Sequence, residues 1–272
     1  MSDPIIFDRA QVRRQRDRAA SSLSAHDFLL RESADRLVDR LLDVTRRFPL
    51  ALDLGCHGGE LAARLQGRFG IERLLASDLS PRLADLARRH GPALAVAADE
   101  EMLPFAEGRF DLVISNLSLH WVNDLPGTLL QIRRLLKPDG LFLASMLGGE
   151  TLRELRHCLL EAELAEEGGA GPRISPFVDL RDAGALLQRA GFALPVADID
   201  PVSVTYGNPL ALLADLRAMG EGNALTVRRR HFSRRATFAR AMALYHQHYA
   251  DPEGRLPASF QIVTLTGWSP AQ

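Results

Sequence analysis

The stretch ALDLGCHGGEL at residues 51–61 decides the fold of this chain. An apolar run leads into Asp53, Gly55 follows it, and Gly58 and Gly59 precede a segment with the apolar spacing of a helix. Glycines in such a turn permit positive φ angles and let the backbone approach a ligand closely. A buried strand, a glycine-rich turn and a helix together predict a ligand-binding loop at the carboxyl edge of a parallel sheet.

The order of residues in this turn distinguishes between classes of ligand. His57 stands between the first glycine and Gly58-Gly59, so the GxGxxG fingerprint of dinucleotide-binding proteins is not met. The carboxylate of Asp53 would repel a pyrophosphate but attract the ammonium of a cofactor that carries an amino acid. The turn therefore predicts a cofactor with an amino-acid part.

Segments typical of strands and helices alternate outward from this turn. We expect five buried strands, with helices between them, at 50–54, 74–78, 94–98, 111–115 and 140–147. Continuous apolar strands of this kind predict a parallel sheet with helices on both faces. Two closing strands are expected at about 192–199 and 259–268, which makes an α/β fold with a seven-stranded, mostly parallel sheet. Helical insertions follow the fifth strand at about 149–190 and 208–250, within a single domain of residues 33–272; the arginine-rich residues 1–32 could fold over the site as a lid.

Composition and charge exclude several classes of protein. The 272 residues are 46% apolar and 25% charged, which suits a globular protein with a sizeable core. The 33 basic and 34 acidic side chains give a net charge of −1, so no overall basic field favours nucleic acid as a partner. The sequence contains neither a membrane-spanning apolar run nor a secretory signal. We expect a cytoplasmic protein, which could work near the inner-membrane surface.

Two further strands are followed by acidic residues. Asp78 ends the second expected strand, where it can accept both hydroxyls of a ribose. Asp99 follows the third strand and can accept an adenine amino group, while Glu100 can present its backbone amide to the ring. Each acid alone could equally be a solvated side chain at a strand end. Together with Asp53 and the glycine turn, they form a much more specific pattern.

At this point the sequence resembles the Rossmann-like, class I S-adenosylmethionine-dependent methyltransferases. The matching pieces are LDLGCHGG, SDLS, ADEEMLPF, FDLVISNLSLHWV and LLKPDGLFL, which lie between about residues 50 and 145. The resemblance implies S-adenosyl-L-methionine as cofactor and assigns its contacts to Asp53, Gly55, Gly59, Asp78, Asp99 and Glu100, with Leu79 and Ser115 beside them. His57 departs from the family, which usually has glycine there. Its imidazole could narrow the site, weaken cofactor binding or donate a hydrogen bond to the cofactor carboxylate.

Other motifs, spread over nearly the whole chain, narrow the resemblance. IFDR, RFPLALDLGC, SLHWVNDLP, LGGETLRELR, LLQRAGF, AMGEGN and LPASFQI are similar to the mitochondrial complex I assembly factors that act as protein-arginine hydroxylases. The malonyl-carrier-protein methyltransferases of biotin synthesis resemble the chain next most closely. The first resemblance implies hydroxylation of an arginine in a quinone-site subunit of respiratory complex I, which would be the protein partner. The early position of IFDR favours a bacterial counterpart without a transit peptide.

Candidate catalytic residues follow the fourth strand, in SNLSLHW. Ser115 and Asn116 are expected at the strand end, facing the methionine part of the cofactor. His120 could be a polar lid or a general base, with Trp121 as a substrate wall. Equally, His120 could be a hydrogen-bonded structural residue and Trp121 part of the core. The catalytic candidates are therefore His120 and Asn116.

The residues themselves leave the reaction open. No metal site is predicted, because His246 and His248 fall on different faces of a helix and no HxD or HxE motif occurs. Methyl transfer requires only that donor and acceptor be positioned, with at most one base. Three functions stay open: modification of a protein side chain, methyl transfer to a carboxylate or small molecule, and a non-catalytic assembly chaperone that keeps its cofactor.

The sequence also contains two clusters of arginine residues and two cysteines. The clusters are Arg13, Arg14, Arg16 and Arg18 near the start, and Arg228, Arg229, Arg230, Arg234 and Arg235 in the later insertion. Each cluster is interpreted first as a solvated face and otherwise as a docking surface for an acidic protein; the first could also close over the cofactor. Cys56 and Cys158 lie far apart and fit no metal-binding spacing, so we expect reduced thiols.

Overall fold

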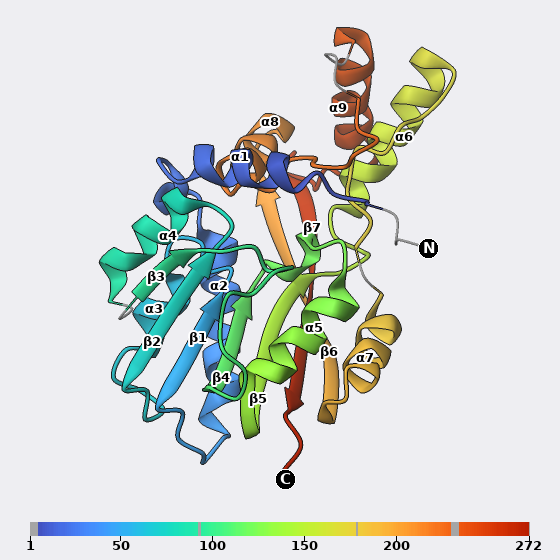
Figure 1. Ribbon diagram of the computed structural model, residues 1–272. Helices are drawn as coiled ribbons and strands as arrows, with labels where there is room; N and C mark the ends of the chain where they lie inside the picture. Colours follow the sequence, from blue (N-terminus) through green and yellow to red (C-terminus); the bar gives the residue numbers. More distant parts are fainter. Residues whose placement is uncertain (1–4, 92–93, 178, 230–233, 272) are drawn as a thin grey trace.

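The computed structural model describes residues 5–91, 94–177, 179–229 and 234–271, and these form an α/β fold around one sheet (Figure 1). The strands are β1 (Leu50–Leu54), β2 (Arg73–Asp78), β3 (Leu94–Ala97), β4 (Phe110–Asn116), β5 (Leu136–Leu147), β6 (Ala193–Tyr206) and β7 (Leu256–Trp268). The described residues form a seven-stranded sheet in the order β3-β2-β1-β4-β5-β7-β6. Strands β1 to β5 pair in parallel, whereas β7 is antiparallel to both β5 and β6. This confirms the predicted seven-stranded, mostly parallel sheet.

Helices surround this sheet in the described part of the chain. Their bounds are α1 (Arg9–Ala19), α2 (Phe28–Leu42), α3 (Glu60–Leu65), α4 (Pro81–Ala87), α5 (Leu125–Leu135), α6 (Arg153–Glu167), α7 (Leu180–Arg189), α8 (Pro209–Ala218) and α9 (Arg235–Tyr249), with 3₁₀ turns η1 (Leu23–Ala25), η2 (Arg88–His90) and η3 (Leu119–Trp121). No described helix has the length and apolar character needed to cross a membrane.

Local sequence signals place several of these boundaries. Ser80 caps α4, because its side chain accepts from the backbone N–H of Leu83 at 3.2 Å, and Pro81 occupies the first turn. Gly91 follows η2 with φ +100°, as the expected helix end requires. The fifth strand, predicted at 140–147, begins earlier, because pairing with Phe110 starts at Leu136 and places the segment KPDG inside β5.

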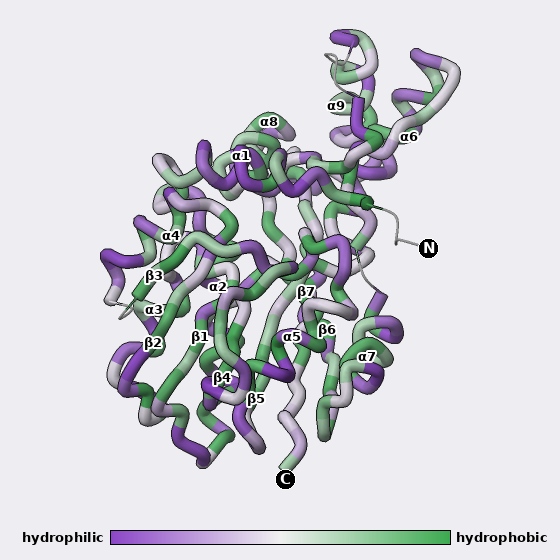
Figure 2. The backbone as a smooth tube through the Cα atoms, viewed as in Figure 1, coloured by the Kyte–Doolittle hydropathy of each residue, from purple (hydrophilic) through white to green (hydrophobic). Residues whose placement is uncertain are grey.

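The two faces of the sheet bury separate apolar cores. Because side chains alternate along a strand, Ala51 lies in the core with α2 and α3, and Leu52 lies in the core with α5 and α7. Figure 2 shows the mostly hydrophobic strands between these helices. Both faces are therefore covered, as buried parallel strands require.

A further layer lies over the carboxyl edge of the parallel strands. Helices α1 and α8 lie across this edge, while α6 and α9 pack against each other and project from the body of the protein (Figure 1). The strand order reverses between β1 and β4, and in folds of this kind ligands bind at the carboxyl side of that point. The layer thus covers the edge where the sequence predicts the cofactor.

Candidate functional site

The turn after β1 has a backbone that requires glycine at two positions. The N–H of Gly55, at φ +72°, donates to the carbonyl of Ser77 at 2.8 Å and ties the turn to β2. Gly59, at φ +93°, begins α3, and a Cβ there would lie 3.0 Å from the Cα of Ala87. Positive φ and close packing together explain these two glycines.

Asp53 is a buried acid without a partner. Its side chain is fully shielded from solvent, and neither carboxylate oxygen has a hydrogen-bond partner among the described residues. Burial raises the pKa of Asp53 well above its ordinary value, and the nearby negative charges of Glu60 and Asp78 raise it further. Leaving a buried polar group unpaired costs free energy, so this carboxylate is prepared to accept a cation or a donor.

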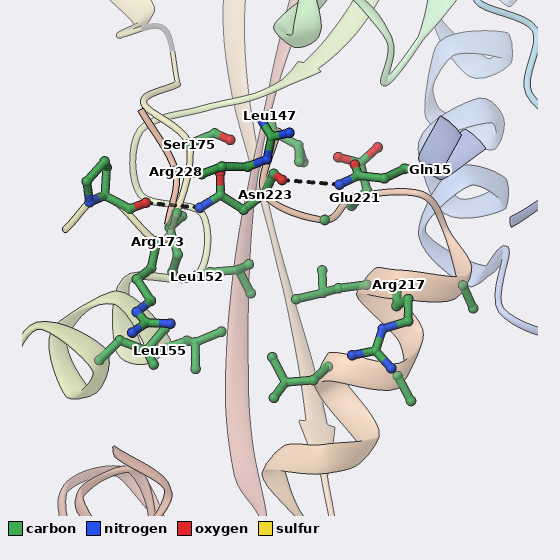
Figure 3. A pocket seen from close by; sticks show the side chains of 18 of the residues that line it. Gln15, Leu147, Leu152, Leu155, Arg173, Ser175, Arg217, Glu221, Asn223 and Arg228 are labelled. Carbon is green, nitrogen blue, oxygen red and sulfur yellow. Dashed lines mark hydrogen bonds between the residues drawn. The ribbon is translucent and has the colours of Figure 1, made fainter. Parts of the chain in front are cut away.

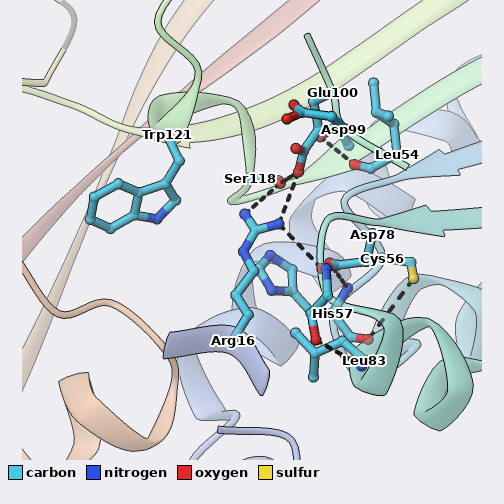
Figure 4. Close-up of polar contacts among 12 residues, drawn as sticks. Arg16, Leu54, Cys56, His57, Asp78, Leu83, Asp99, Glu100, Ser118 and Trp121 are labelled. Carbon is cyan, nitrogen blue, oxygen red and sulfur yellow. Dashed lines mark hydrogen bonds and ion pairs between the residues drawn. The ribbon is translucent and has the colours of Figure 1, made fainter. Parts of the chain in front are cut away.

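An arginine from the N-terminal helix occupies the centre of the site (Figure 4). The guanidinium of Arg16 lies 2.9 Å from a carboxylate oxygen of Glu100 and 3.4 Å from one of Asp78, and it donates to the hydroxyl of Ser118 at 2.8 Å. Only 1% of the Arg16 side chain is exposed. The interpretation of Arg16 as part of a solvated face is therefore wrong.

A second arginine of α1 holds the next acid. Arg9 pairs with Asp99 at 2.5 Å and also with Glu100. Burial alone would raise the pKa of Glu100, but the positive charges of Arg16 and Arg9 outweigh it and lower that pKa to about 2. Glu100 is therefore ionised and pairs through its side chain, while the contact of its backbone amide with the adenine ring stays a prediction.

Both carboxylate oxygens of Asp78 also accept from backbone groups. One accepts from the N–H of Ser80 at 2.8 Å and the other from the N–H of His57 at 3.1 Å. Leu79, beside it, is half-buried and packs against the apolar cluster that contains Trp121. The structure thus brings the acids together but links them to the protein's own groups.

The ring of His57 contacts backbone carbonyls of the segment after β4. Its Nε2 lies 3.0 Å from the carbonyl oxygen of Asn116 and 3.2 Å from that of Leu117, and its Nδ1 has no partner among the described residues. Burial lowers the pKa of His57, and the positive charge of Arg16 lowers it further, so the ring is neutral and donates from Nε2. The positive φ of 45° at this residue is the backbone conformation that explains a glycine in the family.

Ser115 and Asn116 make structural hydrogen bonds. The hydroxyl of Ser115 donates to the carbonyl of Leu54 at 2.6 Å. The amide of Asn116 donates to the carbonyl of Leu30 at 2.8 Å and accepts from Ser145 at 3.0 Å. These bonds connect β4 to β1, α2 and β5, so nothing in this geometry supports a catalytic role for Asn116.

His120 and Trp121 share one carboxylate, that of Glu221. Nε2 of His120 lies 3.1 Å from a Glu221 oxygen, and Nε1 of Trp121 donates to the same oxygen at 3.1 Å. Burial would raise the pKa of Glu221, but the interaction with His120 outweighs it and lowers that pKa. Glu221 is not among the predicted site residues, although the motif AMGEGN that supports the family resemblance contains it.

A large cavity lies beside these residues, between α1, α6 and α8 (Figure 3). Its volume is about 1340 Å³, and its lining includes Gln15, Trp121, Phe177, Glu221 and Asn223. The described residues that line it include none of the predicted cofactor acids. In this conformation the cavity and the acids are therefore separate, with α1 between them.

The chain was compared with known proteins. Residues 52–144 match the methyltransferase domain family. The mitochondrial arginine-hydroxylase NDUFAF5 of Danio rerio is 47% identical over 268 residues, covering 97% of this chain and 83% of the relative. The human protein of that name is 44% identical, covering 97% and 76%. The malonyl-[acyl-carrier protein] O-methyltransferase of Methylovorus sp. is 35% identical, covering 99% and 92%.

This chain belongs to the class I S-adenosylmethionine-dependent methyltransferase superfamily.

Solved methyltransferase structures share the fold at low sequence identity. A putative methyltransferase of Bacillus halodurans gives a TM-score of 0.59 at 14% identity, covering 88% of this chain and all of the other. Phosphoethanolamine N-methyltransferase 2 of Haemonchus contortus, in complex with S-adenosylmethionine, gives 0.57 at 18% identity, covering 95% and 60%. The predicted Rossmann-like methyltransferase fold is confirmed.

The residues of this chain fit the cofactor of its superfamily. The unpaired carboxylate of Asp53 lacks the positive partner that a ligand ammonium would supply. Asp78 and Asp99 stand at or just after neighbouring strand ends with their carboxylates directed at cationic groups. This set of acceptor groups thus fits a nucleoside that carries an amino acid, although Arg16 and Arg9 pair with some of the acids in this structure.

The arginine clusters and the two cysteines differ in their exposure and in their partners. Arg13, Arg14 and Arg18 are exposed, Arg228 pairs with Asp8, Arg229 pairs with Glu163 and Glu167, and Arg230 lies outside the described residues. Cys56 and Cys158 are both buried and unpaired. Within the residues described, no group of three or more His, Cys, Asp or Glu side chains could hold a metal ion.

Proposed function

We propose that this chain binds S-adenosylmethionine at the carboxyl edge of β1 and β2 and modifies an arginine side chain of a protein partner. Asp53 would hold the cofactor ammonium, Asp78 the ribose hydroxyls and Asp99 the adenine amino group. Gly55 and Gly59 would let the backbone approach the ligand. The proposal extends to this chain what the superfamily and the chemistry of these residues suggest.

The observation that carries the proposal is the buried, unpaired carboxylate of Asp53. A folded protein rarely retains such a group unless a ligand supplies the missing partner, because the unpaired carboxylate lowers stability. The expected partner is a positive donor, since burial and nearby acids penalise the free carboxylate. An α-ammonium group has that charge and those donors.

Bound at these residues, S-adenosylmethionine would supply an electrophilic methyl group, which serves methyl transfer, whereas hydroxylation would take its oxygen atom from dioxygen with a two-electron reductant. The chain's own contribution beside it is the pair of His120 and Glu221. Because the carboxylate of Glu221 holds Nε2–H of His120, the lone pair of Nδ1 stays without a partner among the described residues. His120 can therefore accept a proton at Nδ1, as a general base positioned by a carboxylate.

The nature of the substrate follows from the relatives and from the cavity. Relatives named arginine-hydroxylase align over 97% of the chain, which supports arginine hydroxylation during assembly of respiratory complex I. The cavity of about 1340 Å³ exceeds the roughly 300–1,000 Å³ of most small-molecule pockets and suits a protein segment. The aromatic ring of Trp121 and the carboxylate of Glu221 in its lining suit a guanidinium.

Calorimetry and mass spectrometry test the two halves of the proposal. S-adenosylmethionine titrated into the wild-type protein should give saturable binding that Asp78→Asn weakens strongly. The matched control is Asp85→Asn, which changes an exposed acid on α4. A quinone-site subunit of complex I, incubated with the enzyme, S-adenosylmethionine, dioxygen and a two-electron reductant, should gain the mass of one oxygen atom on an arginine, with the second oxygen atom released as water. An unmodified subunit would contradict the proposed reaction.

A second candidate function is methyl transfer to a carboxylate. It is favoured by the malonyl-[acyl-carrier protein] O-methyltransferases, which are 35% identical over nearly the whole chain. Arg18 and Arg217 line the cavity, are exposed and form no ion pair within the part of the chain that is described, so they could bind an anionic substrate. A gain of one methyl group on a malonyl-carrier protein would establish this function instead.

A further inference from the structure

Helix α1 lies on the acids of the cofactor site, and we infer that it is an internal competitor of the cofactor: Arg16 must leave Asp78 before S-adenosylmethionine binds. The inference rests on the proposed function, which assigns Asp78 to the ribose. It adds a closed state, held by α1, and an open state, in which the cofactor takes the place of Arg16.

Helix α1 directs two arginines toward the acids of the cofactor site. Arg9 and Arg16 are two helical turns apart, so they project from the same face of the helix. Between them they pair with the four acids at or just after the ends of β2 and β3, namely Asp78, Asp99, Glu100 and Glu101. A single arginine could reach one acid by chance, but this face of α1 matches the whole set.

The net charge of the cofactor matches that of the Arg16 side chain. S-adenosylmethionine carries a sulfonium, an ammonium and a carboxylate, so its net charge equals that of one arginine. Ionised acids buried without positive charge are strongly destabilising, and Arg16 supplies that charge in the structure. Exchange of Arg16 for the cofactor therefore replaces one positive charge beside Asp78 and Glu100 with another.

Helix α1 buries few apolar side chains against the rest of the protein. Its buried residues are Val12, Arg16 and Ala19, so ion pairs supply much of what holds the helix on the protein. The exposed Ser21 and Ser22 connect it to η1, where Leu23 is buried. Segments with few buried apolar contacts open at low free-energy cost, as a helix that yields to a ligand must.

Side chains of the protein occupy the space beside Gly55 in the turn after β1. The hydroxyl of Ser118 accepts from Arg16, donates to Glu100 at 2.8 Å, and stands where a Cβ on Gly55 would be, at 2.1 Å. The space in front of the glycine turn is thus taken by one connected set of side chains. Withdrawal of Arg16 breaks that set.

Calorimetric titration of S-adenosylmethionine into the full chain tests the inference. A protein whose binding-competent state is a minor fraction binds with an apparent Kd raised by that fraction, so Arg16→Ala should lower the Kd about tenfold or more. The matched control is Arg13→Ala, which removes the same charge from the exposed face of α1 and should leave the Kd unchanged. Equal or weaker binding by Arg16→Ala overturns the inference, whereas the proposed function stands.

Hydrogen exchange of the wild-type protein provides a second readout, which does not depend on the folding of a variant. Saturating S-adenosylmethionine should increase amide exchange in residues 9–19 as α1 leaves the acids. Unchanged or increased protection of α1 overturns the inference. If neither the wild type nor Arg16→Ala binds the cofactor, the proposed function itself is wrong and the inference falls with it.

Discussion

Substitution of Asp53 by asparagine should stabilise the protein while it removes cofactor binding. Both carboxylate oxygens of Asp53 are buried without a partner, and burial raises its pKa well above the ordinary value. A buried polar group without its partner costs about 1–3 kcal/mol, and more when it is charged. The neutral amide avoids the charged part of this cost. We expect a gain of about 1–3 kcal/mol at neutral pH, since removing an unfavourable buried charge is the reverse of creating one.

The pH dependence gives this prediction a definite sign. Since the pKa of Asp53 is higher in the folded than in the unfolded protein, the wild type loses stability as the pH rises from about 4 through the folded-state pKa. The amide side chain of the variant does not titrate. The advantage of Asp53→Asn should therefore be absent below about pH 3, where the carboxyl is protonated in both states, and should grow as the pH rises toward neutral.

The assay is urea unfolding followed by circular dichroism, with Asp111→Asn as the matched control. Asp111 is also buried, but it accepts from the backbone N–H of Leu50 at 2.9 Å and pairs with Lys137 at 2.9 Å. Its substitution should destabilise the protein by about 1–3 kcal/mol and leave cofactor affinity intact. If Asp53→Asn is as destabilising as Asp111→Asn, the interpretation of Asp53 as a carboxylate that awaits a ligand is refuted.

Three further predictions follow from single residues. Gly55→Ala should destabilise the protein by about 1–3 kcal/mol in urea unfolding, because φ is +72° and the new Cβ would lie 2.1 Å from Ser118; wild-type stability would contradict the described turn. Glu221→Gln should lower thermal stability by about 1–3 kcal/mol, since Trp121 loses a charged acceptor, whereas an unchanged Tm would argue against this pair. Burial lowers the pKa of His57, so the wild type should lose stability as the pH falls below about 6.5, and His57→Asn should lose less over that range when both are unfolded at pH 5 and pH 8.

The sequence predicts the fold well because the governing signals are local. Apolar runs of strand length, the cap at Ser80 and the glycine at 91 each depend on a few neighbouring residues, and the structure has strands at the predicted runs. The boundary between α5 and β5 was wrong because the pairing of Leu136 with Phe110 is a long-range contact. The segment KPDG is accommodated as an irregularity in β5, where Asp139 has a φ of +58°.

The site is predicted less well because its contacts cross long distances in the sequence. The acids of the site could be located from strand ends, since parallel strands bring their carboxyl ends together. Nothing local indicates that Arg16 reaches Asp78 and Glu100, or that Glu221 reaches His120. An arginine on a helix is solvated or buried according to what lies opposite it, which only the tertiary structure shows.

A crystal structure of the protein with S-adenosylhomocysteine, the methyl-free form of the cofactor, tests the central claim most directly. We predict that the ligand's amino group binds the Asp53 carboxylate and that its ribose hydroxyls bind Asp78. A complex in which the ligand lies elsewhere, with Asp53 still unpaired, would contradict the account.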